Sequence, residues 1–94
     1  MYVITVKFTV NPAHLPAFRE AVVAQANNSL EQEAGCHQFD VSVAENNPCI
    51  VLLYEIYSDR AAFDAHLETE HFHAFDQLVT PWVTNKVVNS WEKV

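Results

Sequence analysis

The chain has 94 residues, half of them hydrophobic, and its 12 acidic residues outnumber five lysines and arginines to give a net charge of −7. This length predicts a single domain over residues 1–94, and the scarcity of basic residues argues against binding to nucleic acid or to an anionic membrane surface. Two cysteines, Cys36 and Cys49, are too few for a disulfide framework, and the sequence shows neither a membrane-spanning run nor a signal peptide. We therefore expect a cytoplasmic protein with no nucleic-acid or membrane partner.

The first predicted element is a strand from Tyr2 to Val10, in which apolar side chains occupy every second position. A period of two indicates a strand with one buried face. Asn11-Pro12 then ends the strand, because proline has no backbone N–H to donate to a sheet.

A helix is predicted next, from about Leu15 to Glu33. Pro16 is compatible with a helix only in the first turn, so the helix cannot begin much earlier. Gly35 is the only glycine of the chain and follows the helix, where we expect it to adopt a left-handed capping conformation. The apolar stripe at helical spacing consists of Leu15, Phe18, Val22, Ala26 and Leu30.

Two further strands are predicted, at about His37–Ala44 and Cys49–Tyr57, on either side of a turn at residues 45–48. The later strand is apolar at nearly every position. Such a run indicates burial on both faces of the strand.

The remaining elements are two short helices and a strand. Ser58 or Asp59 is suited to cap a helix that reaches about Leu67, and Thr69 is suited to cap a second from about residue 70 to 79. Pro81 ends that helix. A last strand then covers about residues 84–92.

The order β-α-β-β-α-β predicts an α+β, ferredoxin-like fold, an antiparallel sheet with helices on one face. Helices on one face leave the strand at Cys49–Tyr57 apolar on the uncovered face as well. A second copy packed on that face explains the pattern, so we expect a homodimer that forms a dimeric α+β barrel.

Three titratable residues are candidates for chemistry. Glu55 is an isolated carboxylate in an apolar strand, where an ionised group is costly unless it is paired. His66 follows Phe63 by three residues, and His71 precedes Phe75 by four, so each histidine shares the apolar face of its helix. We expect the three to border one pocket if Glu55 faces the helices; if it faces the other way, its role is structural, at the dimer interface.

Five further residues are candidates for the lining of that pocket. His37 opens a strand near the same region, and Asn28 offers an amide near the end of the long helix. The aromatic residues Phe39, Phe72 and Trp82 complete the set. Each of the five also fits a purely structural role at the surface, in the core or in an interface.

Several other kinds of site are not supported. The spacing of His66 and His71 is five residues, whereas two zinc ligands on one helical face need three or four, so we expect no metal. A single glycine cannot build a dinucleotide-binding loop, and no serine or cysteine has a convincing base nearby.

Two segments carry a resemblance to a known family. Glu33-Ala34-Gly35-Cys36 and His66-Leu67-Glu68-Thr69-Glu70-His71, together with the first strand and the region of Glu55, resemble the antibiotic biosynthesis monooxygenase family along essentially the whole chain. This resemblance implies a dimeric barrel and oxygenases that need no cofactor. His66, His71 and Glu55 fall on family motif positions, while Asn28 and Phe39 lie beside such positions. Relatives that degrade haem have an Asn in the first strand and a Trp at the position of His66, and this chain has neither.

The resemblance therefore implies a small monooxygenase that acts on a quinol or phenol with O₂ and without a cofactor. His66 or His71 is expected to be the general base. Two alternatives stay open: an isomerase of a small phosphorylated hydroxyketone, and a module that binds a small ligand without catalysis. The five basic residues offer little for phosphate recognition, which places the isomerase second.

Overall fold

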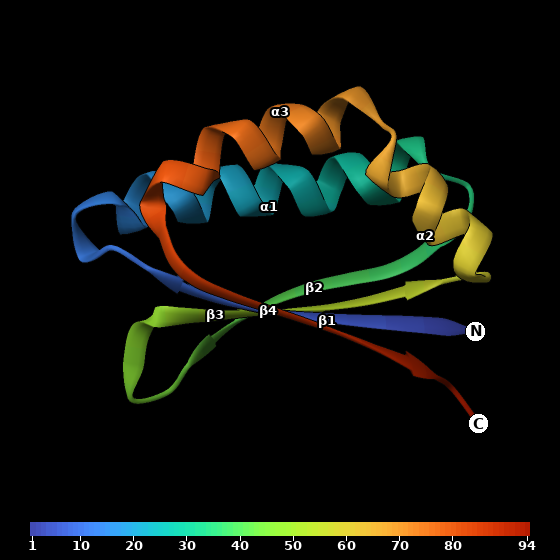
Figure 1. Cartoon of the computed structure of the whole chain (residues 1–94), viewed down its shortest axis with the longest axis horizontal. Helices are drawn as coiled ribbons and strands as arrows, with labels where there is room; N and C mark the ends of the chain where they lie inside the picture. The colour runs from blue at the N-terminus through green and yellow to red at the C-terminus, as the bar shows by residue number, and fades with distance from the viewer.

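The computed structural model describes residues 1–94 as one sheet with helices on one of its faces (Figure 1). None of the helices is both long and apolar enough to cross a membrane. The helices and strands run in the order β1 (Tyr2–Val10), α1 (Leu15–Gln32), β2 (Cys36–Ala44), β3 (Asn47–Tyr57), α2 (Arg60–Leu67), α3 (Glu70–Val79) and β4 (Val83–Glu92), with 3₁₀ turns at Pro12–His14 and Thr80–Trp82.

The four strands form an antiparallel sheet in the order β2-β3-β1-β4. This topology, with α1 packed beside α3 above the sheet, is the ferredoxin-like α+β fold predicted from the sequence (Figure 1). Strand β3 lies inside the sheet and pairs with both β1 and β2, whereas β4 is an edge strand. Because side chains alternate along a strand, β3 supplies one set of residues to the helices and another to the open face.

Local caps place the break between α2 and α3. The side chain of Asp59 accepts a hydrogen bond from the N–H of Ala62 at 2.8 Å and begins α2. Thr69 Oγ1 accepts a hydrogen bond from the N–H of Phe72 at 3.2 Å and begins α3. The chain therefore turns between residues 67 and 70, which brings His66 and His71 together with 6.0 Å between their ring centroids.

The core lies between the helices and the facing side of the sheet. Phenylalanine rings fill much of it: Phe8 meets Phe18 edge-to-face at a centroid distance of 5.2 Å, and both rings also pack against Phe75. Tyr57, Phe18, Ile4, Val10 and Val22 are among the side chains that are completely enclosed.

The predicted stripe of α1 is wrong at its C-terminal end. Leu30 is 44% exposed, and the buried face continues instead through Gln25 and Ser29. Successive steps of four residues each overshoot a helical turn by about 40°, so a stripe drawn as 18, 22, 26 and 30 rotates out of the core. Of the polar residues on this buried face, Gln25 contacts His71.

The prediction for Gly35 is also wrong. No residue of the chain has a positive φ, and α1 ends with Glu33 in an extended conformation. Glycine is needed here for space, because a Cβ at residue 35 would lie 2.7 Å from the Cβ of Ala62 on α2. The glycine therefore allows the start of β2 to approach α2 closely.

Candidate functional site

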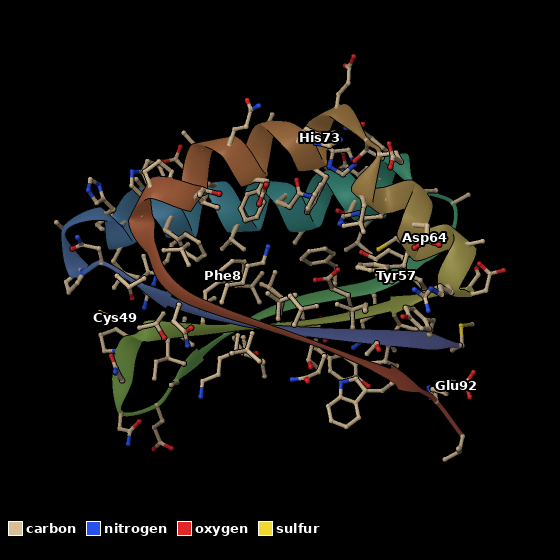
Figure 2. The ribbon with its side chains drawn as sticks, viewed as in Figure 1. Phe8, Cys49, Tyr57, Asp64, His73 and Glu92 are labelled. Carbon is tan, nitrogen blue, oxygen red and sulfur yellow. The ribbon has the colours of Figure 1, made fainter.

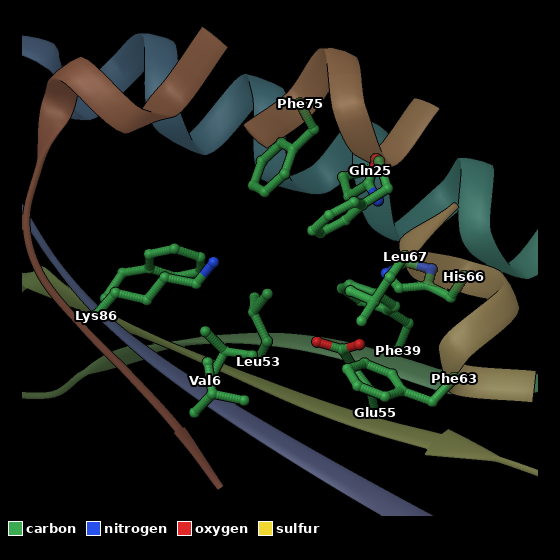
Figure 3. Close-up of a pocket in the computed structure, with 13 residues that line it drawn as sticks. Val6, Gln25, Phe39, Leu53, Glu55, Phe63, His66, Leu67, Phe75 and Lys86 are labelled. Carbon is green, nitrogen blue, oxygen red and sulfur yellow. The ribbon is translucent and has the colours of Figure 1, made fainter. Parts of the chain in front are cut away.

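A cavity of about 240 Å³ lies between the sheet and the helices (Figure 3). Four polar residues border it: Gln25, Glu55, His66 and Lys86. The walls are otherwise aliphatic and aromatic, formed by Val6, Phe8, Phe39, Leu53, Phe63, Leu67, Phe72, Phe75 and Val88. This volume fits a small molecule with an aromatic ring better than a large cofactor.

Glu55 faces the helix side of the sheet and borders the cavity. It is 3% exposed, and the Tyr57 hydroxyl donates a hydrogen bond to its Oε1 at 2.6 Å. Burial raises the pKa of Glu55 to about 7, and the charge of Glu33 adds to this shift, while the Tyr57 hydrogen bond and Lys86 oppose it. Glu55 therefore exists in both protonation states near neutral pH and is suited to accept or donate a proton.

His66 borders the same cavity and is also 3% exposed. Its Nδ1 lies 2.9 and 3.0 Å from the two carboxylate oxygens of Glu33. Burial lowers the pKa of His66, although the hydrogen bond and charge of Glu33 act in the opposite direction. A neutral ring whose Nδ1–H donates to Glu33 carries its lone pair on Nε2, which makes no hydrogen bond to the protein. His66 can therefore act as a general base towards a molecule in the cavity.

His71 lies behind this pair rather than on the cavity. Its Nε2 is 2.8 Å from Glu33 Oε2, although the direction is not that of a good hydrogen bond, and its Nδ1 is 3.1 Å from Gln25 Oε1. It lines a separate groove between α1 and α3, together with Asn28. The structure thus brings His66, His71 and Glu33 into contact, but only Glu55 and His66 of the three predicted catalytic residues share the cavity.

Of the other predicted pocket residues, Phe39 and Phe72 line the cavity, whereas His37, Asn28 and Trp82 do not. His37 sits at a register shift between β2 and β3, is exposed, and lies 2.6 Å from the Ser58 hydroxyl. Asn28 accepts a hydrogen bond from Gln32 on the outer part of α1. Trp82 stacks on His14 at the far end of the helices, with 5.5 Å between ring centroids.

Three residues of the site were not singled out from the sequence. Glu33 was part of the family motif, but nothing in its local context marked it as the partner of two histidines 33 and 38 positions later. Gln25 would have emerged from a helical wheel drawn at 3.6 residues per turn, because it lies three residues after Val22. Lys86 follows from strand alternation, since it pairs with the buried Phe8 across β1 and β4.

The structure contains no group of three or more histidine, cysteine, aspartate or glutamate side chains arranged to hold a metal ion. The Nδ1 of His66 is directed at a carboxylate and its Nε2 at an apolar cavity. That geometry suits proton transfer, and the expectation that the reaction needs no metal stays a prediction.

The sheet topology and the cavity between the sheet and the helices define a ferredoxin-like α+β protein with an internal cavity of the size of a small molecule. The family model described as antibiotic biosynthesis monooxygenase matches residues 1–78, and the chain belongs to this family. The resemblance drawn from the sequence is thereby confirmed.

Solved structures agree with this assignment. A protein of Nitrosomonas europaea that carries the same family name is 28% identical, with a TM-score of 0.95 and coverage of 100% of this chain and 99% of that chain. A protein of Pseudomonas aeruginosa is 25% identical, with a TM-score of 0.90 and coverage of 99% and 93%. A protein of Mycobacterium tuberculosis, 21% identical with coverage of 99% and 94%, shares the fold at a TM-score of 0.91. No match is found among curated proteins.

Proposed function

We propose that the protein is a monooxygenase that oxidises a small, electron-rich phenol or quinol with O₂, without metal or flavin. The observation that carries this proposal is the pairing of two proton-transfer groups, His66 and Glu55, in one cavity whose other walls are mostly aromatic or aliphatic. Membership of the monooxygenase family supports the reaction type.

The first step is deprotonation of the substrate. His66 Nε2 accepts the proton of a phenolic hydroxyl, and Glu33 at 2.9 Å from Nδ1 stabilises the imidazolium that forms. The resulting phenolate is rich enough in electrons to react with O₂. The apolar walls exclude water and strengthen the electrostatic interactions within the cavity.

The reaction balances without an external reductant. For a quinol, one oxygen atom of O₂ enters the ring and the other leaves as water, so a quinol and O₂ give a hydroxyquinone and H₂O. All four electrons come from the substrate. The proton taken by His66 returns to the reduced oxygen, and Glu55, with a pKa of about 7, is a second source or acceptor of protons.

An isomerase of a phosphorylated hydroxyketone is the second candidate, because Lys86 borders the cavity and supplies the cation that such a substrate needs. Nine of the 13 lining residues are hydrophobic, and a polyhydroxylated molecule would leave most of its polar groups unpaired against them. The monooxygenase therefore explains the cavity better.

Oxygen uptake with a panel of quinols tests the proposal, with ¹⁸O₂ as the oxygen source. One labelled atom is expected in the product and one in water. His66→Ala is expected to lower turnover by about 10²-fold or more, the usual scale for loss of a positioned base, while the protein stays folded.

His73→Ala is the matched control, because His73 is an exposed histidine on α3. It is expected to keep full turnover. Equal turnover in His66→Ala and the wild type would remove the catalytic assignment. Binding of quinols without any oxygen uptake would leave a binding module as the better account.

A further inference from the structure

Lys86 is the only cationic side chain that borders the cavity. It comes from the edge strand β4, directly opposite Phe8 of β1, so it points to the helix side of the sheet. Its Nζ lies over the Phe8 ring, 5.7 Å from the ring centroid. Lys86 thus places a positive charge beside an otherwise apolar wall of the cavity.

The protein itself pairs this charge only loosely. The nearest carboxylate oxygen is Asp76 Oδ1 at 3.8 Å, beyond the roughly 3.2 Å of a good hydrogen bond. Both side chains are 40% exposed or more, so the pair is strongly screened by water. The ammonium group is therefore available to an anionic group that enters the cavity.

Lys86 and the proton-transfer groups occupy different parts of the cavity (Figure 3). Lys86 lies at one end, below the C-terminal part of α3, and His66 lies at the other end, where α2 ends. Glu55 and the apolar residues Leu53, Val6 and Phe75 line the space between them. A ligand that uses both ends needs a hydroxyl group near His66 and a negatively charged substituent that points away from that hydroxyl group.

We propose that the cavity selects aromatic substrates that carry an anionic substituent, such as a carboxylate, at a ring position that is not adjacent to the reacting hydroxyl group, and that Lys86 recognises this substituent. The inference rests on the proposed function and adds the class of its substrate. The net charge of −7 and the two nearby carboxylates, Glu33 and Glu55, would otherwise repel such an anion, so the selectivity must come from this one lysine.

The test compares two quinols that differ only in charge: 2,5-dihydroxyphenylacetate and its neutral amide. KM is measured from oxygen uptake, and binding is measured by calorimetry under anaerobic conditions, where no turnover occurs. The acid is expected to have the lower KM and Kd in the wild type. Lys86→Met keeps the apolar stem and is expected to raise both constants about 2- to 5-fold for the acid, the scale of a partly exposed ion pair, with little change for the amide.

Lys93→Met is the control, since it removes the same charge from an exposed residue outside the cavity. It should leave the preference for the acid intact. Lys86→Arg should preserve the preference in part. Added salt should weaken the preference in the wild type and have little effect in Lys86→Met.

The outcomes separate this inference from the proposed function. Turnover of the amide with no advantage for the acid, or the same advantage in Lys86→Met, would overturn the role of Lys86 and leave the monooxygenase standing. If neither compound binds or is consumed, the phenol site itself is wrong, and the inference falls with it.

Discussion

The two faces of the sheet differ in a way that one strand illustrates. On β3, Val51, Leu53 and Glu55 face the helices and are at most 3% exposed, whereas Leu52 and Tyr54 face the other way and are 41% and 38% exposed. Side chains extend from both sides of the sheet (Figure 2), and the open side mixes apolar residues with polar ones such as Thr5 and Lys7. Apolar residues of the same strand therefore have two roles: those on the helix side line a cavity, and those on the open side form an uncovered surface.

The open face continues across the neighbouring strands. Trp91 and Val87 of β4 are 54% and 42% exposed, and Trp91 Nε1 donates a hydrogen bond to Thr5 Oγ1 at 3.0 Å. Large apolar residues that stay exposed on one face of a sheet favour association with another surface. We propose that a second copy of the chain covers this face and forms a homodimer.

A charge introduced on the open face is expected to have the largest effect on dimer formation. Leu52→Asp is expected to weaken the dimer by about 10³-fold or more, because two-fold symmetry buries two unpaired carboxylates in one interface. Sedimentation equilibrium at micromolar concentration measures the change. Leu30→Asp is the matched control, since Leu30 is exposed to a similar extent, 44%, but lies on α1. A wild-type monomer, or an unchanged dimer in Leu52→Asp, would contradict the assignment of this face.

On the helix side of the sheet, the buried carboxyl group of Glu55 is expected to make the free energy of unfolding depend on pH. The pKa of Glu55 is raised from 4.5 to about 7 by burial, so the folded state holds a proton that the unfolded state has released between these values. Its contribution is fully present below pH 4.5 and is lost as the pH rises through 7. The expected loss in the free energy of unfolding is on the order of 3 kcal/mol at most.

Glu55→Gln keeps an oxygen that accepts from Tyr57 and removes the titration, so the variant should lose less stability than the wild type between pH 5 and 8. Urea denaturation at the two pH values measures the difference. Glu31→Gln, at an exposed position of α1, should follow the wild type. The same pH dependence in Glu55→Gln and the wild type would show that Glu55 is not a buried titrating group.

Local sequence signals were sufficient to predict most of the fold. Alternation, proline positions and the caps at Asp59 and Thr69 predicted the elements to within two residues of their observed bounds. These signals work because they act between residues close in the chain. The α1 stripe and Gly35 were wrong for a related reason: one depends on accumulated helical rotation and the other on the close approach of Ala62 on α2.

The site was only partly predictable. Glu55 was recognisable as a polar residue in an apolar strand, and His66 as a histidine on a buried helical face. The contact of Glu33 with both histidines was not, because it joins residues at least 33 positions apart. Three predicted lining residues fall outside the cavity: His37 lies at a register shift between β2 and β3, Asn28 lines the groove between α1 and α3, and Trp82 stacks on His14 at the far end of the helices.

The central claim is that Glu33 holds His66 with Nε2 as a bare acceptor in the cavity. Nitrogen-15 NMR of the histidine side chains at pH 8 tests it directly, with 2,5-dihydroxyphenylacetate added under anaerobic conditions. We predict that free His66 carries its proton on Nδ1, and that the ligand shifts its Nε2 resonance but not those of His73. A His66 ring protonated on Nε2, or a His66 spectrum that does not respond to a ligand bound at saturation, would contradict the account.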